Sequence, residues 1–269
     1  MKLVAQGKER LGLLLVGHGT RSSRGQQEFL QTAKLVAGLD PNALVEPCFL
    51  ELAEPGIESG VFSLARRGAT RLTVAPLLLF AAGHAKHDIP RAVQRAIKST
   101  RFQTFAYAET LGCHPKLLEM SRQQHRAAVA GRPVVSAQAT VSLLVGRGSS
   151  DPDAVNQLRQ FARSRAMTDL SSRTEIAFMA KADPSLKDIL ADISVAAPRR
   201  VVVQPHLLFF GEVLASLNEQ IAHAVIAQSD TEWLLCEHLG PSIPVAEVVM
   251  ERCQQPTSTK QVTTIQAGS

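Results

Sequence analysis

The sequence has few of the features that mark nucleic-acid-binding proteins. Aromatic residues make up only 4% of the 269 residues, and although the formal net charge is +5, the chain contains no dense run of Lys and Arg. A basic excess of this size can attract a small anionic ligand. Binding of nucleic acids usually relies on basic stripes and stacking aromatics, which are scarce here. We therefore expect no nucleic-acid partner.

Cysteine pairs and long apolar runs are also missing. The four cysteines show no metal-knuckle or CxxC spacing; they are Cys48, Cys113, Cys236 and Cys253. Isolated thiols of this kind are typical of small buried residues in a reducing cytoplasm. The apolar run Leu11–Val16 is too short for a signal peptide or a membrane span. The sequence thus predicts a cytoplasmic protein without a membrane partner.

The motifs of several large enzyme classes are absent as well. We find no P-loop, no Gly-x-Ser-x-Gly elbow and no dinucleotide-binding fingerprint. Hydrophobic residues make up 45% of the chain and charged residues 20%, as in globular proteins. The length suits two domains of ordinary size.

What the sequence does contain is an internal repeat. At a shift of 129 positions, the segment Leu14-Leu15-Val16-Gly17-His18-Gly19 falls on Leu143-Leu144-Val145-Gly146-Arg147-Gly148. Eight further residues of the first copy are identical to the residue 129 positions later: Glu46, Phe49, Ala53, Pro55, Arg71, Pro76, Leu79 and Phe80. At a shift of 128, Glu109, Leu111 and Gly112 match Glu237, Leu239 and Gly240. Matches spread over so much of the chain indicate duplication of a whole structural unit.

The duplication provides an internal control, because residues needed for packing should persist in both copies. Three polar residues of the first copy do not persist: His18 becomes Arg147, Glu51 becomes Ala180, and His84 becomes Val213. Their joint loss marks His18, Glu51 and His84 as candidates for function.

Each copy alternates apolar runs with amphipathic stretches. Strands are predicted at 11–16, 44–50, 71–78 and 103–108, and again at 140–145, 175–179, 200–206 and 232–236. Helices are predicted at 24–38, 55–68, 87–99 and 115–130, and again at 152–165, 184–195, 211–228 and 241–253. This alternation predicts an α/β fold of two tandem domains, each a parallel sheet flanked by helices.

Turn-forming and polar segments divide the chain. Gly131-Arg132-Pro133 separates an N-terminal catalytic domain, residues 1–132, from a degenerate repeat, residues 133–255. Residues 256–269 have little apolar content and are predicted to be a disordered tail. Asp151-Pro152, Glu54-Pro55 and Asp183-Pro184 each suggest a capping side chain followed by proline at the first helical position.

The three candidate residues each follow a predicted strand. Ligands of open parallel sheets bind beyond the carboxyl ends of the strands, so His18, Glu51 and His84 can converge on one crevice. Two imidazoles and a carboxylate can bind a divalent metal or accept protons. Each residue also has an ordinary interpretation. The Gly17-His18-Gly19-Thr20 turn can present backbone N–H groups to an anion, and Glu51 can interact with a helix dipole. His84 precedes His87 and Asp88, which can cap the next helix.

Taken together, the motifs resemble the sirohydrochlorin chelatases of the CbiX/SirB type. The resemblance rests on Val16-Gly17-His18-Gly19-Thr20-Arg21, on Phe49-Leu50-Glu51-Leu52-Ala53-Glu54-Pro55, on Pro76-Leu77-Leu78-Leu79 followed by Gly83-His84 and Lys86-His87-Asp88-Ile89-Pro90, and on Leu111-Gly112-Cys113-His114-Pro115. It covers residues 10–253 and includes the two-repeat layout of the longer members. These motifs are specific only as a set.

The resemblance implies a lyase that inserts cobalt or ferrous iron into sirohydrochlorin, in siroheme or cobalamin biosynthesis. It maps His18, Glu51 and His84 onto the metal-handling and catalytic residues of the family, with no cofactor beyond the metal substrate. The second half departs at all three positions and is expected to be a scaffold. Either Glu51 or a histidine takes the proton.

Sirohydrochlorin carries carboxylates, so basic residues near the crevice are candidate substrate contacts. The candidates are Arg21, Arg24, Lys86, His114, Arg147 and His206. For the charged residues the alternative is a solvated charge, for His114 a helix cap, and for His206 a core or cap position.

Other functions remain open at this stage. A non-catalytic metal or tetrapyrrole carrier fits the same residues, whereas a one-metal hydrolase would need more carboxylates near the strand ends. The sequence decides neither the metal nor whether the chain is a monomer, with the duplication replacing a dimer, or a homo-oligomer.

Overall fold

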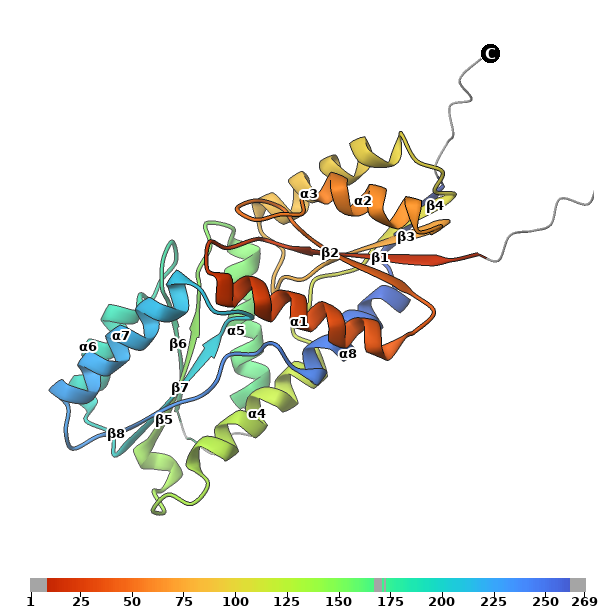
Figure 1. The fold of residues 1–269 in the computed structure, drawn as a ribbon. Coiled ribbons are helices and arrows are strands. Elements are labelled where there is room, and N and C mark those ends of the chain that lie inside the picture. Colours follow the sequence, from red (N-terminus) through yellow and green to blue (C-terminus); the bar gives the residue numbers. More distant parts are fainter. Residues whose placement is uncertain (1–8, 167–170, 172, 262–269) are drawn as a thin grey trace, which may run out of the picture.

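The chain forms two open sheets that follow one another along the sequence (Figure 1). In the computed structural model, the described residues are 9–166, 171 and 173–261. The first half contains β1 (Leu11–Gly17), α1 (Ser23–Leu39), β2 (Leu44–Phe49), α2 (Ile57–Arg66), β3 (Arg71–Pro76), α3 (Gly83–Ile97), β4 (Thr104–Tyr107) and α4 (Pro115–Val129). The second half contains η1 (Ala137–Ala139), β5 (Thr140–Gly146), α5 (Pro152–Ala166), β6 (Arg173–Phe178), α6 (Leu186–Ala196), β7 (Arg200–His206), α7 (Glu212–Ala227), β8 (Glu232–Leu235), α8 (Ile243–Gln254) and β9 (Ser258–Gln261).

Both sheets have the same strand arrangement. The first sheet has the order β2-β1-β3-β4-β9, and the second has β6-β5-β7-β8. All pairings are parallel except that of β9, which runs antiparallel to β4. The predicted fold class, two parallel sheets flanked by helices, is confirmed.

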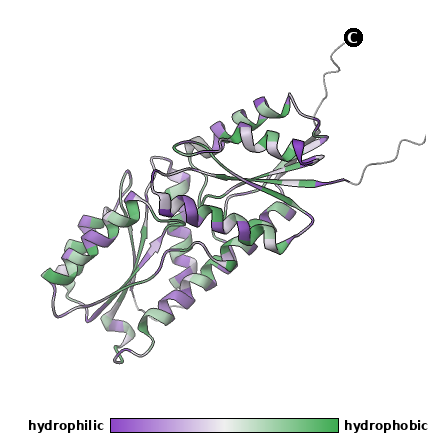
Figure 2. Ribbon diagram, in the orientation of Figure 1, coloured by the Kyte–Doolittle hydropathy of each residue, from purple (hydrophilic) through white to green (hydrophobic). Residues whose placement is uncertain are grey.

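Helices cover both faces of each sheet, which explains why the central strands are almost continuously apolar. On the outer faces, α2 and α3 pack against the first sheet and α6 and α7 against the second. On the inner faces, one continuous core includes Leu13 and Phe29 of the first half and Leu144 and Phe161 of the second. Figure 2 shows the strands coloured mostly hydrophobic, whereas each helix carries both hydrophobic and hydrophilic residues.

The last helix of each repeat packs on the other half. Helix α8, from the second repeat, lies against α1 and β3 of the first. Helix α4, from the first repeat, lies against α5, β7 and β8 of the second. Val245 and Val249 of α8 are buried in the shared core, and Val129 of α4 packs against Val202 of β7. The boundary between residues 132 and 133 therefore separates the two sequence repeats, but each repeat contributes its last helix to the packing of the other.

Several local predictions are wrong. Ser258–Gln261 form β9, so residues 258–261 are not a disordered tail, while residues 262–269 lie outside the described part. Helices α2 and α6 begin after the N-caps Gly56 and Ser185, so Pro55 and Pro184 are not first helical residues. Both follow cis peptide bonds.

The cysteines are unpaired, as predicted; Cys48, Cys236 and Cys253 are buried and Cys113 is half-buried. All four cysteines are free thiols, and burial raises the pKa of Cys253 to about 12. Among the described helices, none is long and apolar enough to cross a membrane.

Candidate active site

His18 and Glu51 meet where β1 and the edge strand β2 of the first sheet end. His18 follows β1 and Glu51 follows β2, two strands that pair in parallel up to Gly17 and Phe49. His18 Nε2 lies 3.5 Å from Glu51 Oε1, and the two side chains are 30% and 51% exposed. An imidazole and a carboxylate are thus held together at a surface that a ligand can reach.

The backbone fixes this pair. The Glu51 N–H donates to the His18 carbonyl at 3.1 Å, and the Leu50 N–H donates to the Gly17 carbonyl at 2.9 Å. Gly19 has a φ of +99°, and Leu52 has a φ of +64°. Because the two turns are joined through their main chains, the side chains of residues 18 and 51 leave adjoining strands side by side.

His84 belongs to α3 rather than to the loop after β3. The helix begins at Gly83, four residues earlier than predicted, so His87 and Asp88 do not cap its start. The side chain of His84 lies outside the described part of the structure. Among the described side chains, no group of three His, Cys, Asp or Glu residues suited to a metal ion occurs. The described part of the candidate metal site is therefore the His18–Glu51 pair.

Lys86 lies two residues beyond His84 and is held by the second half. Its Nζ is 2.8 Å from Asp151 Oδ2 and 2.9 Å from Asp153 Oδ2. Asp151 also accepts a hydrogen bond from the Asp153 N–H through Oδ1, at the start of α5. Hydrogen bonds to Asp151 and Asp153 raise the pKa of Lys86, and the bond from Lys86 lowers the pKa of Asp151. In this structure Lys86 joins the two halves through its ion pairs.

His114 and His206 occupy structural positions. His114 is the N-cap of α4, where its Nδ1 accepts from the Lys116 N–H at 3.3 Å, and its Nε2 lies 3.1 Å from Glu251 Oε2. Burial lowers its pKa. His206 is 3% exposed and lies between the rings of Phe80 and Phe161, with centroid distances of 5.4 and 4.3 Å. Burial lowers the pKa of His206 to about 3, so the ring is neutral in the core.

Three arginines lie near the facing carboxyl ends of the two sheets. Arg21 and Arg147 are exposed. The guanidinium of Arg24 lies 4.4 Å from the centroid of the Phe210 ring and pairs with Glu28 at 2.8 Å. Arg21 and Arg147 are therefore accessible to an anionic ligand, whereas Arg24 is part of the contact between the halves.

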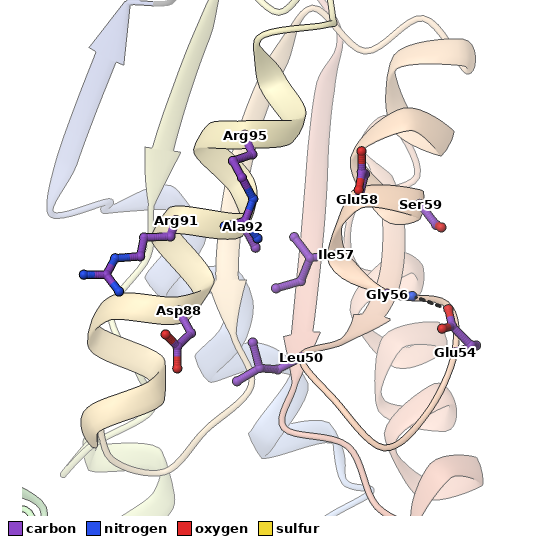
Figure 3. Close-up of a pocket in the computed structure, with 10 residues that line it drawn as sticks. All are labelled: Leu50, Glu54, Gly56, Ile57, Glu58, Ser59, Asp88, Arg91, Ala92 and Arg95. Atoms are coloured by element: carbon purple, nitrogen blue, oxygen red, sulfur yellow. Dashed lines mark hydrogen bonds between the residues drawn. The ribbon is translucent and has the colours of Figure 1, made fainter.

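A charged groove of about 590 Å³ opens between α2 and α3, beside the residue that precedes Glu51 (Figure 3). Leu50 and Ile57 point from the β2–α2 segment toward α3. Arg91 and Arg95 of α3 and Glu54 and Glu58 near α2 add charges of both signs; Gly56, Ser59, Asp88 and Ala92 complete the lining. With both signs present, the groove shows no preference for one class of ligand.

Comparison with known proteins places the chain in a family. The model of the CbiX family matches residues 12–128 and again residues 141–256. The chain belongs to the CbiX family. The double match agrees with the internal repeat. Because both copies match the same family model, the side chains at positions 18 and 51 can be compared directly with those at positions 147 and 180.

Relatives in this family include chelatases for two metals. The chain is 30% identical over 251 residues to a sirohydrochlorin ferrochelatase of Priestia megaterium, covering 92% of this chain and 91% of the relative. It is 29% identical over 246 residues to a sirohydrochlorin cobaltochelatase of the same organism, covering 90% and 79%. The solved structure of SirB from Bacillus subtilis with Fe3+ matches with a TM-score of 0.80 and 25% identity, covering 91% of this chain and 95% of that chain.

The sequence analysis missed Asp151 and Asp153 as partners of Lys86. A signal was present in the repeat, because their counterparts at a shift of 129 are Ser22 and Arg24. The second copy thus gained two carboxylates opposite a lysine that only the first copy has. Such a contact cannot be found from either copy alone, because it joins residues of different copies; Lys86 and Asp153 are 67 positions apart in the sequence.

Proposed function

We propose that this protein inserts a divalent metal ion, cobalt or ferrous iron, into sirohydrochlorin. The observation that carries the proposal is the His18–Glu51 pair at the strand ends of a CbiX-family chain, with Arg and Ala at the matching positions of the second half. His84 is proposed as the third member of the set. The metal is a substrate here, and the relatives of both kinds leave cobalt and iron as equal candidates.

The chemistry requires groups that bind a metal and groups that accept protons. A free tetrapyrrole loses two pyrrole protons when a divalent ion enters. In the proposed reaction, the neutral His18 imidazole binds the ion while it sheds water, since imidazole is a common ligand of such metals. Glu51, 3.5 Å away, orients the imidazole and accepts the two pyrrole protons one after the other, passing the first to solvent before it takes the second. The exposure of both side chains allows a planar substrate to approach them.

The charges around the pair suit a polycarboxylate. Arg147, at the position that matches His18, is exposed at the carboxyl edge of the second sheet. Together with Arg21 it is proposed to attract substrate carboxylates. Exposed charge pairs contribute little, so Arg147→Ala should weaken substrate binding by no more than about fivefold.

The test is anaerobic mixing of the protein, sirohydrochlorin and either Co2+ or Fe2+, followed by the absorbance of the macrocycle. A catalyst produces many equivalents of metallated product per protein, at rates above the protein-free reaction. A carrier gives at most one equivalent and retains the product. The latter result would replace the chelatase proposal with that of a binding protein.

A further inference from the structure

The two halves meet at two junctions whose residues occupy matching positions of the internal repeat. At the first junction, large side chains fill the space between the halves. There, Glu28 of α1 accepts a hydrogen bond from the Phe210 N–H at 2.6 Å and lies 3.0 Å from His238 Nε2. The side chains of Glu28 and His238 are only 11% and 7% exposed. Although burial raises it, hydrogen bonds from Phe210, Arg24 and His238 hold the pKa of Glu28 below its usual value. A Cβ on Gly25 would lie 2.1 Å from the Phe210 carbonyl oxygen, so the contact is tight.

At the related junction the filling groups have been lost. Glu28 and Phe210 correspond to Gln157 and Ala81 at a shift of 129, and His238 corresponds to Thr110 at a shift of 128. The main chain supports this correspondence: Leu111 and Gly112 donate to Leu78 and Leu79 just as Leu239 and Gly240 donate to Leu207 and Leu208. Gln157, Ala81 and Thr110 together line a pocket of about 440 Å³. Ala81 and Thr110 are smaller than the phenyl ring and the imidazole at the matching positions, which accounts for the space, while Gln157 has the size of Glu28 without its charge.

The pocket lies beside the candidate active site. Its lining includes Pro76, at the end of β3, and Ala108, just after β4. In the order β2-β1-β3-β4, these strand ends continue the row that starts with Glu51 and His18. Strands in a sheet are about 4.8 Å apart, so the pocket begins roughly one to two strand spacings from His18. A tetrapyrrole centred on the His18–Glu51 pair would extend its rim in this direction.

The lining combines apolar walls with one cation and one carboxylate, that of Glu109. Pro76, Ala81 and Pro90 are apolar, whereas Gln157 and Gln160 carry neutral amides. The cation is Arg252 of α8, which donates to Glu109 Oε2 at 2.8 Å and to the Leu111 carbonyl at 3.2 Å. Its Nε is buried and has no hydrogen-bond partner among the described residues. Arginine binds carboxylates through several N–H groups, so a short apolar stem that ends in a carboxylate can enter this pocket and share the Arg252 guanidinium with Glu109.

We infer that this pocket, defined by Ala81, Thr110, Gln157 and Arg252, holds a peripheral carboxylate arm of the tetrapyrrole. The inference rests on the proposed function and assigns the second repeat a part in substrate binding, since Gln157 and Arg252 belong to it. The arm enters where Phe210 and His238 close the related junction, and its carboxylate pairs with Arg252.

The experiment measures the KM for sirohydrochlorin in one variant that fills the pocket and in one that removes its arginine. Ala81→Phe supplies the ring that Phe210 supplies on the other side, and it should raise the KM for sirohydrochlorin tenfold or more. Arg252→Gln should raise it by about tenfold, as expected for a lost charged hydrogen bond. Co2+ binding measured without tetrapyrrole should stay unchanged in both variants. Arg126→Gln, in an exposed pair with Glu119 on α4, is the matched control and should leave KM unchanged.

A third variant guards against misfolding of Ala81→Phe. Gln157→Glu keeps the side-chain shape, introduces the charge found in Glu28, and should raise KM through repulsion that weakens at high salt. Unchanged KM in folded Arg252→Gln and Gln157→Glu would overturn the inference. Direct titration of sirohydrochlorin without metal separates the two proposals. If the wild type binds it but turns over no metal, the chelatase proposal fails, while weaker binding by Arg252→Gln still supports the pocket.

Discussion

The turns after the first two strands of each half, β1 and β2 in one and β5 and β6 in the other, have nearly the same backbone but different side chains. Gly19 and Gly148 have φ values of +99° and +87°, and Leu52 and Lys181 have values of +64° and +59°. The Glu51 N–H donates to His18 and the Ala180 N–H to Arg147, at 3.1 and 3.0 Å. The frame was kept in both copies because the fold needs it. The imidazole of His18 and the carboxylate of Glu51 occur in one copy only, which is why we propose that these side chains carry the chemistry.

The largest expected effect on activity comes from replacing His18, for example by the arginine found at the matching position 147 of the second half. His18→Arg, His18→Ala and His84→Ala should each reduce metal insertion to near the protein-free rate, because each removes a proposed metal ligand. All three should keep the far-UV circular dichroism and melting temperature of the wild type, since His18 is partly exposed just after β1 and residue 84 lies in the first turn of α3. Near-normal turnover in a folded variant would exclude that residue from the site.

Glu51→Gln tests the proton acceptor with little change in shape. General acid–base groups typically contribute about 10²–10⁴-fold to a rate, and we expect a kcat loss in that range with sirohydrochlorin binding largely kept. Ala180→Glu, which gives the second half the carboxylate found at position 51 of the first, should leave kcat unaltered. If Glu51→Gln instead weakens binding at constant kcat, the carboxylate positions the substrate.

The shared frame can be broken in either half. A Cβ at residue 19 would lie 1.7 Å from the Glu51 carbonyl oxygen, and one at residue 148 would lie 1.7 Å from that of Ala180. The left-handed conformation alone costs a non-glycine residue about 1–2 kcal/mol. Gly19→Ala and Gly148→Ala should therefore both lower the urea midpoint of unfolding. Only Gly19→Ala should also lower kcat far beyond the fraction unfolded.

The ion pairs of Lys86 offer a smaller perturbation near the site. Lys86→Met removes the contact of α3 with Asp151 and Asp153, and we expect metal insertion to fall by about fivefold, as for other partly exposed pairs. Lys86→Arg should recover most of it. Lys116→Met is the control, because Lys116 also bridges two carboxylates, those of Glu247 and Glu251, and lies on α4. Equal effects of the two Met variants on activity would show that the contact near α3 has no special role.

The smallest effect at neutral pH is expected for His206→Leu, which restores the residue found at position 77. The ring carries no charge in the fold, with a pKa of about 3, and its Nε2 has no partner among the described residues. The unfolded state takes up a proton between its ordinary pKa near 6.5 and pH 3, so the wild type should lose stability as the pH falls through this range. Urea unfolding at pH 7 and pH 4.5 should show less acid destabilisation in His206→Leu than in the wild type. Parallel losses would contradict the buried neutral imidazole.

The strands and most helices could be predicted because apolar runs and repeated motifs mark them in both copies. The same repeat pointed to residues 18 and 51, which the structure brings together. It could not show that Lys86 pairs with Asp151, because that contact joins the two copies, nor that His114 caps α4. Strand β9 was missed because Ser258–Gln261 are polar and form an edge strand that pairs only with β4. The repeat also says nothing of which sheet the last helix of each copy covers.

The crossing of α4 and α8 sets the order in which the protein can be completed during synthesis. The inner face of the first sheet stays partly uncovered until α8, which ends at Gln254, has left the ribosome. The second sheet, by contrast, has α4 available before its own first strand is made. The half proposed to be catalytic is therefore finished last, and a nascent chain that stops before α8 exposes the apolar surface of α1 and β3 that this helix covers.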